Sequence, residues 1–138
     1  MNRLYGLIGF PLGHSFSARY FTEKFQRENL SGYEYRNFPL ESIRELPAML
    51  ENHPGLLGFN VTIPYKQEVI PFLTALSAEA REIGAVNCVK ITPQGLYGHN
   101  TDAYGFRKSL LGLIGPMRPD ALILGTGGAS KAVGYVLR

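Results

Sequence analysis

The chain has 138 residues, 45% of them hydrophobic and 18% charged, which suits one ordinary globular domain or slightly more. Eight Phe and eight Tyr argue against a disordered chain, and the single cysteine, Cys88, excludes a scaffold of internal disulfides. No apolar run approaches the ~20 residues that a membrane span needs, which argues against a membrane-spanning helix. Residues 1–82 hold eight bases and nine acids, whereas residues 83–138 hold six bases and two acids. The excess of basic residues after residue 82 reflects either drift in surface composition or a binding site for an anionic ligand. The basic residues are scattered along the chain, so they do not predict a nucleic-acid partner.

Strand and helix patterns alternate along the chain, with turn residues between them. The expected elements are a strand at 4–8, a helix at 17–28, a strand at 33–38, a helix at 41–51, a strand at 56–63, a short helix opened by Pro64, a helix at 77–83, a hairpin of strands 86–92 and 96–99, a helix from 101 or 102 to about 111, a buried strand at 121–124 and a final helix.

This order predicts an α/β fold whose sheet is mostly parallel with one hairpin. Residues 1–100 supply enough apolar faces for one core, and residues 101–118 form a connecting helix and a linker. Only about 20 residues follow the linker, too few to bury a core of their own, so we expect residues 119–138 to begin a second, incomplete domain.

A glycine-rich turn lies between the last predicted strand and helix. Its residues are Gly125, Thr126, Gly127, Gly128, Ala129 and Ser130. Strand, glycine turn and helix in this order are typical of a Rossmann dinucleotide site, where backbone N–H groups at the helix start bind the phosphates. The alternative is an ordinary tight turn, but the flanking strand and helix favour nucleotide binding.

Lys66 and Asp102 are candidates for proton transfer. Lys66 follows the strand-ending Pro64, near the carboxyl end of a strand, where ligands of open α/β sheets collect. Asp102 lies at a helix start, where a carboxylate could pair with this ammonium and fix its position. The alternatives are a solvated lysine and a simple helix cap.

Five further polar residues lie at positions suited to ligand contacts. Ser15 and Ser17 place two hydroxyls in a glycine-rich loop, where they could bind a carboxylate or cap the next helix. Asn60 and Thr62 share one face of a strand, and Asn87 lies within an apolar strand, where its amide needs partners.

Taken together, these motifs resemble shikimate dehydrogenases, oxidoreductases of aromatic amino-acid (chorismate) biosynthesis. The matching segments, which span nearly the whole chain, are GHSFS (13–17), GFNVTIPYK (58–66), GAVN (84–87), GHNTDAYG (98–105) and GTGGASKA (125–132). The resemblance implies a three-layer α/β substrate domain followed by the first βα unit of an NADP-binding Rossmann domain.

The resemblance also implies a role for each candidate. Ser15 and Ser17 would bind the shikimate carboxylate, while Asn60, Thr62, Asn87 and Asp102 would bind ring hydroxyls. Lys66, supported by Asp102, would transfer the proton during NADP-dependent reduction of 3-dehydroshikimate, and residues 125–130 would carry the nucleotide phosphates. No metal site is expected.

Two alternatives stay open. The chain could be a truncated module that binds shikimate without turnover, since shikimate dehydrogenases are about twice this length. The whole protein could instead be an NAD-dependent quinate/shikimate dehydrogenase, although Ser17, which that branch commonly replaces with Thr, favours shikimate. We expect a small-molecule substrate, no nucleic acid, no membrane and a cytoplasmic location, with self-association through the incomplete Rossmann part left open.

Overall fold

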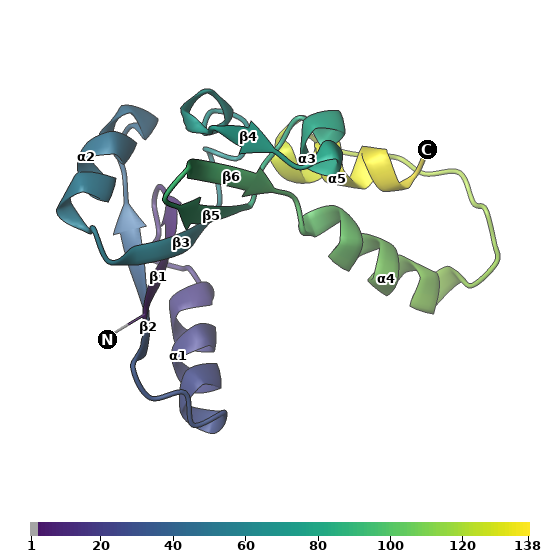
Figure 1. The fold of residues 1–138 in the computed structure, drawn as a ribbon. Helices are drawn as coiled ribbons and strands as arrows, with labels where there is room; N and C mark the ends of the chain where they lie inside the picture. The colour runs from purple at the N-terminus through teal and green to yellow at the C-terminus, as the bar shows by residue number, and fades with distance from the viewer. Residues whose placement is uncertain (1–2) are drawn as a thin grey trace.

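A computed structural model describes residues 3–138 and shows a mixed α/β architecture (Figure 1). Its elements in chain order are β1 (Arg3–Gly9), α1 (Ser17–Arg27), β2 (Tyr33–Pro39), the 3-10 turn η1 (Ile43–Glu45), α2 (Leu46–Asn52), β3 (Leu56–Val61), the 3-10 turn η2 (Ile70–Phe72), β4 (Ala75–Leu76), α3 (Ala78–Ile83), β5 (Cys88–Thr92), β6 (Gly95–His99), α4 (Asp102–Ile114) and α5 (Gly128–Val136).

Six strands form one sheet in the order β2-β1-β3-β5-β6-β4. β1 pairs in parallel with both β2 and β3, and β4 pairs in parallel with β6. The β5–β6 hairpin is antiparallel, and β5 also pairs antiparallel with β3. The predicted α/β class with a mostly parallel sheet and one hairpin is therefore confirmed, while the two-residue strand β4 was not predicted.

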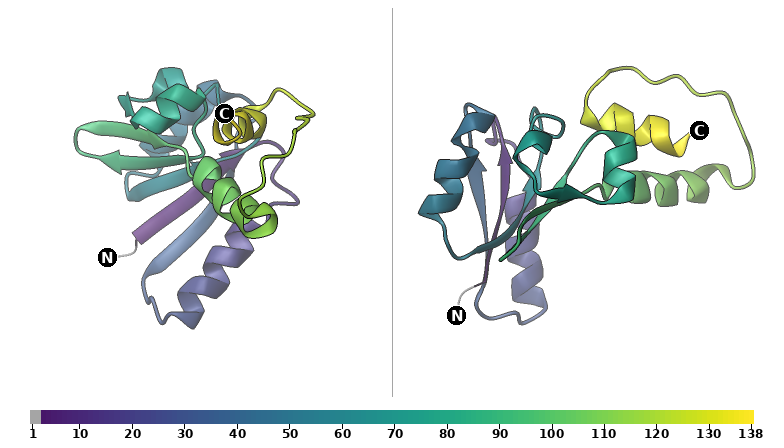
Figure 2. Two further views of the ribbon diagram at one scale, coloured as in Figure 1. Left: turned by 90° about the vertical axis from the view of Figure 1, so that its right-hand side faces the viewer. Right: turned by 45° about the horizontal axis from the view of Figure 1, so that its top comes forward.

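Two apolar cores lie on opposite faces of this sheet, because successive side chains of a strand point to opposite sides. On β1, Ile8 packs into the larger core with α2 and the residues that follow β3. Its neighbour Leu7 packs into a smaller core with Tyr35 and the aromatic face of α1. Helix, sheet and helix make the expected three layers, with α1 and α2 on opposite sides of the strands (Figure 2).

The helices α4 and α5 extend from the end of the sheet and run side by side (Figures 1 and 2). Small side chains allow this packing: Ala132 of α5 is buried together with Ile83, Ala85 and Ala103. None of the helices within residues 3–138 is both long and apolar enough to cross a membrane.

The structure shortens two predicted strands: β3 ends at Val61 and β5 begins at Cys88, so Thr62 and Asn87 lie just outside the strands predicted to hold them. It also corrects two predicted elements outright. The segment that follows Ile63-Pro64 is a series of turns up to Val69 and not a short helix. Residues 121–124, predicted as a buried strand, are neither a strand nor buried, and Leu122 and Leu124 are 84% and 86% exposed. A strand needs a neighbour for its backbone hydrogen bonds, and within residues 3–138 no strand lies beside this segment.

The exposed segment 121–124 generates a first prediction. The double variant Leu122→Asn/Leu124→Asn should bind less of a dye specific for apolar surfaces and should self-associate less than the unmodified chain, because large exposed apolar patches promote association. Dye fluorescence and analytical ultracentrifugation measure both effects. Leu113→Asn, at an 81% exposed leucine of α4, is the control, and equal effects of the two changes would contradict the prediction.

Candidate functional site

Lys66 lies just beyond the carboxyl end of β3, in the turns between β3 and η2. Its carbonyl oxygen accepts a hydrogen bond from the backbone N–H of Val86 at 2.7 Å, which fixes the main chain of the turn. Its ammonium Nζ lies 2.7 Å from Oδ2 of Asp102, with the two side chains 17% and 31% exposed. The structure thus brings together the two residues predicted for proton transfer.

Asp102 is held from its other side by an amide. Nδ2 of Asn87 donates to Oδ1 of Asp102 at 3.0 Å and to the Thr101 hydroxyl at 2.8 Å. The backbone N–H of Thr101 donates to Oδ1 of Asn87 at 2.8 Å. These bonds determine the orientation of the Asn87 amide and leave the carboxylate of Asp102 shared between an ammonium and an N–H₂ group.

The cap of α4 differs from the prediction. Thr101 occupies the N-cap position without a side-chain capping bond, because its hydroxyl is engaged by Asn87. The buried side chain of Asn100 caps the helix instead: its Oδ1 accepts from the N–H of Ala103 at 3.1 Å, and its Nδ2 donates to the carbonyl of Ala85 at 3.0 Å. Asn100 therefore ties the segment before β5 to the start of α4, which carries Asp102.

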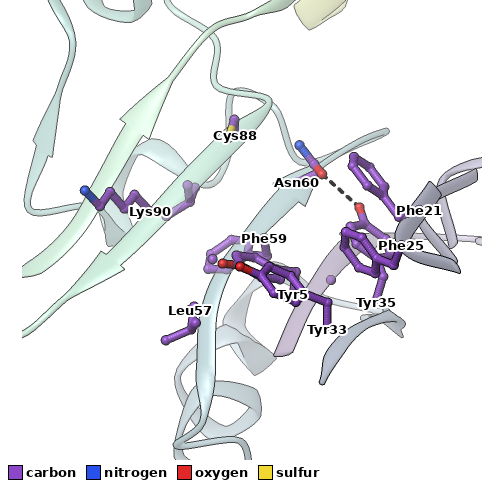
Figure 3. Close-up of a pocket in the computed structure, with 13 residues that line it drawn as sticks. Tyr5, Phe21, Phe25, Tyr33, Tyr35, Leu57, Phe59, Asn60, Cys88 and Lys90 are labelled. Atoms are coloured by element: carbon purple, nitrogen blue, oxygen red, sulfur yellow. Dashed lines mark hydrogen bonds between the residues drawn. The ribbon is translucent and has the colours of Figure 1, made fainter. Parts of the chain in front are cut away.

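Asn60 extends the polar cluster toward α1. Its Nδ2 donates to the carbonyl of Asn87 at 3.3 Å, and its Oδ1 accepts a hydrogen bond of 2.8 Å from the Tyr35 hydroxyl (Figure 3). Tyr35 is buried on β2, and its ring stacks on Phe21 of α1. Sequence reasoning missed Tyr35, because nothing in the alternating segment 33–38 distinguishes it from an ordinary core aromatic residue.

The two predicted serines lie at the start of α1. The hydroxyl of Ser15 accepts a hydrogen bond from the backbone N–H of Ser17 at 3.4 Å, and both residues are partly buried. The N-cap residue of α1 is Phe16, which makes no side-chain capping bond, so the bond from the N–H of Ser17 to the Ser15 hydroxyl is the side-chain contact at the start of this helix.

Thr62 follows β3 and is partly buried, with its N–H donating to the carbonyl of Ile8 at 3.0 Å. Its methyl group approaches Gly9 so closely that a Cβ at Gly9 would lie 2.5 Å away. Thr62 is thereby placed at the carboxyl ends of β1 and β3. No side-chain hydrogen bond of Thr62 is found within residues 3–138.

An aromatic pocket of about 330 Å³ adjoins this cluster (Figure 3). Asn60 and Tyr35 line it together with residues from β1, β5 and α1. Burial raises the pKa of the Cys88 thiol at its edge, so this cysteine is an inert thiol at neutral pH. Among residues 3–138, no three His, Cys, Asp or Glu side chains lie close enough together to hold a metal ion.

The glycine-rich turn has the backbone features that a phosphate site needs. Gly125 has a φ of +121°, which side-chain-bearing residues rarely adopt, and Gly128 begins α5, whose first N–H groups are available to a ligand. A Cβ at Gly127 would meet no atom within 4 Å, so the backbone there is open to an approaching group. These residues fit the phosphates of a dinucleotide.

Comparison with known proteins gives a consistent assignment. Residues 7–89 match the family model for the shikimate dehydrogenase substrate binding domain. The chain is 43% identical over 138 residues to the shikimate dehydrogenase (NADP(+)) of Aquifex aeolicus, covering 98% of this chain and 51% of that protein. The corresponding enzyme of Carboxydothermus hydrogenoformans is 41% identical over 139 residues, with coverages of 98% and 49%.

Solved structures show the same similarity. The shikimate 5-dehydrogenase of Thermus thermophilus in complex with NADP(H) and shikimate superposes with a TM-score of 0.84 at 33% identity. The superposition covers 99% of this chain and 52% of the Thermus chain. The chain therefore spans about half the length of the relatives that it matches.

The buried Tyr35 hydroxyl generates a second prediction. Burial raises the pKa of Tyr35 above its ordinary value, so its neutral form stabilises the fold up to about pH 10, and this contribution is lost at higher pH. Below pH 10, Tyr35→Phe should reduce the free energy of unfolding by about 1 kcal/mol, the value of one hydrogen bond. The difference between the two proteins should shrink as the pH rises above about 10 and should reverse its sign before about pH 11.5, because the stability lost by the unmodified protein grows to about 2 kcal/mol there.

Urea denaturation followed by circular dichroism measures this pH dependence. Tyr104→Phe is the matched control, because Tyr104 is 60% exposed. Stability curves of wild type and Tyr35→Phe that stay parallel between about pH 8 and about 11.5 would show that the Tyr35 phenol does not titrate as its burial requires.

Proposed function

Because the chain belongs to the family of the shikimate dehydrogenase substrate binding domain, we propose that it binds shikimate and 3-dehydroshikimate, and that the whole protein interconverts them with NADP. The observation that carries this proposal is the ion pair of Lys66 and Asp102, held by Asn87 at the carboxyl ends of the strands. This edge is where open α/β sheets bind their ligands.

We assign the substrate carboxylate to Ser15 and Ser17, whose neighbouring positions and partial burial suit an anion bound by two hydroxyls. Asn60, Thr62 and Asn87 are assigned to the ring hydroxyls. The amides of Asn60 and Asn87 are already oriented by bonds to Tyr35, Thr101 and Asp102, so they lose little freedom when a ligand binds.

Lys66 is assigned the proton transfer. In reduction, its ammonium donates a proton to the carbonyl oxygen of 3-dehydroshikimate, and in oxidation its amine accepts the proton of the corresponding hydroxyl. Asp102 holds Nζ at 2.7 Å and so fixes the position of the proton-transferring group. NADPH, when bound, supplies the hydride that reaches the carbonyl carbon.

We assign the cofactor phosphates to residues 125–130, as part of a domain that begins near residue 119 after a substrate domain of residues 1–100 and a connection of residues 101–118. NADP is favoured over NAD because the curated relatives are NADP enzymes. Ser17 favours shikimate over quinate, and a cytoplasmic location is consistent with the single cysteine.

A second candidate, a binding module without turnover, is supported by the exposed segment 121–124. Within residues 3–138, this segment and the glycine turn offer a phosphate site but no neighbouring strands that would enclose the rest of a dinucleotide. The deciding experiment applies calorimetric titration with shikimate and NADP reduction followed by absorbance to the purified chain. Binding without turnover would support the module for this chain, turnover would support a complete enzyme, and absence of shikimate binding would contradict both.

The serine pair generates a third prediction. Ser15→Ala and Ser17→Ala should each weaken shikimate binding by about ten- to a hundredfold, because a hydrogen bond to a charged group contributes about 1.5–3 kcal/mol. Isothermal titration calorimetry measures the dissociation constants. Ser109→Ala, at an exposed serine of α4, should leave the affinity unchanged. Unaltered affinity in both loop variants would refute the carboxylate assignment.

The ion pair generates a fourth prediction, for the whole protein. Lys66→Ala should lower kcat by about 10²- to 10⁴-fold while raising KM less, because it removes a general acid–base group. Asp102→Asn should also lower kcat and change its dependence on pH. Steady-state oxidation of NADPH measures these effects, and Lys108→Ala on the exposed side of α4 is the control. Wild-type kcat in Lys66→Ala would identify Lys66 as a merely structural residue.

A further inference from the structure

We propose that Gly128 is a positioning residue for Lys66: the first residue of α5 leaves out a side chain so that the stem of the lysine can lie against it. The turn assigned to the cofactor phosphates would then fix the position of the lysine assigned to proton transfer. This inference rests on the proposed function of the two groups and adds a contact between them.

The contact leaves no room for a side chain at position 128. A Cβ built on Gly128 would lie 2.6 Å from Cβ of Lys66 and 3.1 Å from its Cδ. The nearest of these atoms, Cβ, is the first atom of the lysine side chain and not its flexible end, so rotation about the outer bonds cannot relieve the overlap. Gly127, one residue earlier in the same turn, has no atom within 4 Å of its Cβ position and has an extended backbone.

Neither partner is free to retreat from this contact. The carbonyl of Lys66 accepts the 2.7 Å bond from Val86, and the preceding Tyr65 is buried with its hydroxyl donating to the carbonyl of Leu40 at 2.6 Å. On the other side, Ala132 fixes α5, because it is 1% exposed against the start of α4 and the end of α3. A methyl group at position 128 must therefore displace the lysine stem or the start of the helix.

Displacement of the Lys66 stem would move the ammonium at its end, which pairs with Asp102. Nζ lies 2.7 Å from Oδ2 of Asp102 while the lysine stem lies against Gly128. If the stem moved, Asp102 could not move with it, because Asn87 holds the other carboxylate oxygen at 3.0 Å. A shift of a few tenths of an ångström or more at Cβ would thus lengthen the contact between Lys66 and Asp102. Gly128 acts on the proposed proton transfer through Lys66 and needs no contact with substrate.

Competitive acylation of the lysines of this chain with limiting acetic anhydride, analysed by mass spectrometry, tests the inference without any ligand. Acylation requires the amine to leave its ion pair, and Lys24, Lys90, Lys108 and Lys131 are internal references. Gly128→Ala should raise the labelling of Lys66 relative to Lys90 by about threefold, comparable with loss of a partly exposed ion pair. Gly127→Ala should leave this ratio unchanged, and Asp102→Asn should raise it.

A double-variant cycle keeps the test valid if Gly128→Ala proves unstable. Lys66→Gly removes the atoms that the new methyl group would meet, so Gly128→Ala should lower the thermal midpoint by several degrees in the unmodified background and by much less in the Lys66→Gly background. An equal drop in both backgrounds, or an unchanged Lys66 ratio in a folded Gly128→Ala protein, would overturn the inference.

The failure of this inference can be distinguished from failure of the proposed function. Saturating shikimate should protect Lys66 of the unmodified chain from acylation, which measures the proposed function alone. If Gly128→Ala changes the labelling of Lys66 but shikimate gives no protection, the contact stands and the substrate assignment fails. If shikimate protects but Gly128→Ala has no effect, the substrate assignment stands and the positioning role of Gly128 fails.

Discussion

The ion pair between Lys66 and Asp102 is the interaction on which the candidate site depends. Its two residues are 36 positions apart, one after β3 and the other at the start of α4. The pairing of β3 with β5, the β5–β6 hairpin and the cap that Asn100 provides together set the relative position of the two side chains. Partial burial shields the pair from solvent more than a surface salt bridge is shielded, while leaving it accessible to a ligand.

A chain of amide hydrogen bonds connects this pair to Tyr35, on the face of the sheet that α1 covers. Tyr35 orients Asn60, Asn60 donates to the backbone of Asn87, and the side chain of Asn87 donates to Asp102. Within residues 3–138, every fully buried side-chain nitrogen or oxygen has a hydrogen-bond partner. A network satisfied in this way determines which groups face the ligand, because turning any one amide would leave a neighbour unpaired.

The helices α4 and α5 pack against the end of the sheet domain through small residues. Ala85, Ala103 and Ala132 let α4, α5 and the end of α3 lie close together, and Gly128 brings the glycine turn against Lys66. Leu122 and Leu124 remain outside this packing, whereas Ile123, 38% exposed, lies against Gly134 of α5. The proposed cofactor turn is thus placed mainly by contacts at the start of α5.

Local sequence by itself determined most elements and the candidate residues, because the period of hydrophobic residues and the turn residues act over only a few positions. The strand at Tyr33–Pro39, the β5–β6 hairpin and the helix after the glycine turn all follow from these local patterns. Local sequence also marked Lys66 and Asp102, but only the tertiary structure decided that they meet. The role of Tyr35, the cap by Asn100 and the contact of Gly128 with Lys66 depend on neighbours distant in sequence. For the same reason residues 121–124 differ from prediction, because their strand-like pattern becomes a strand only where another strand supplies its hydrogen bonds.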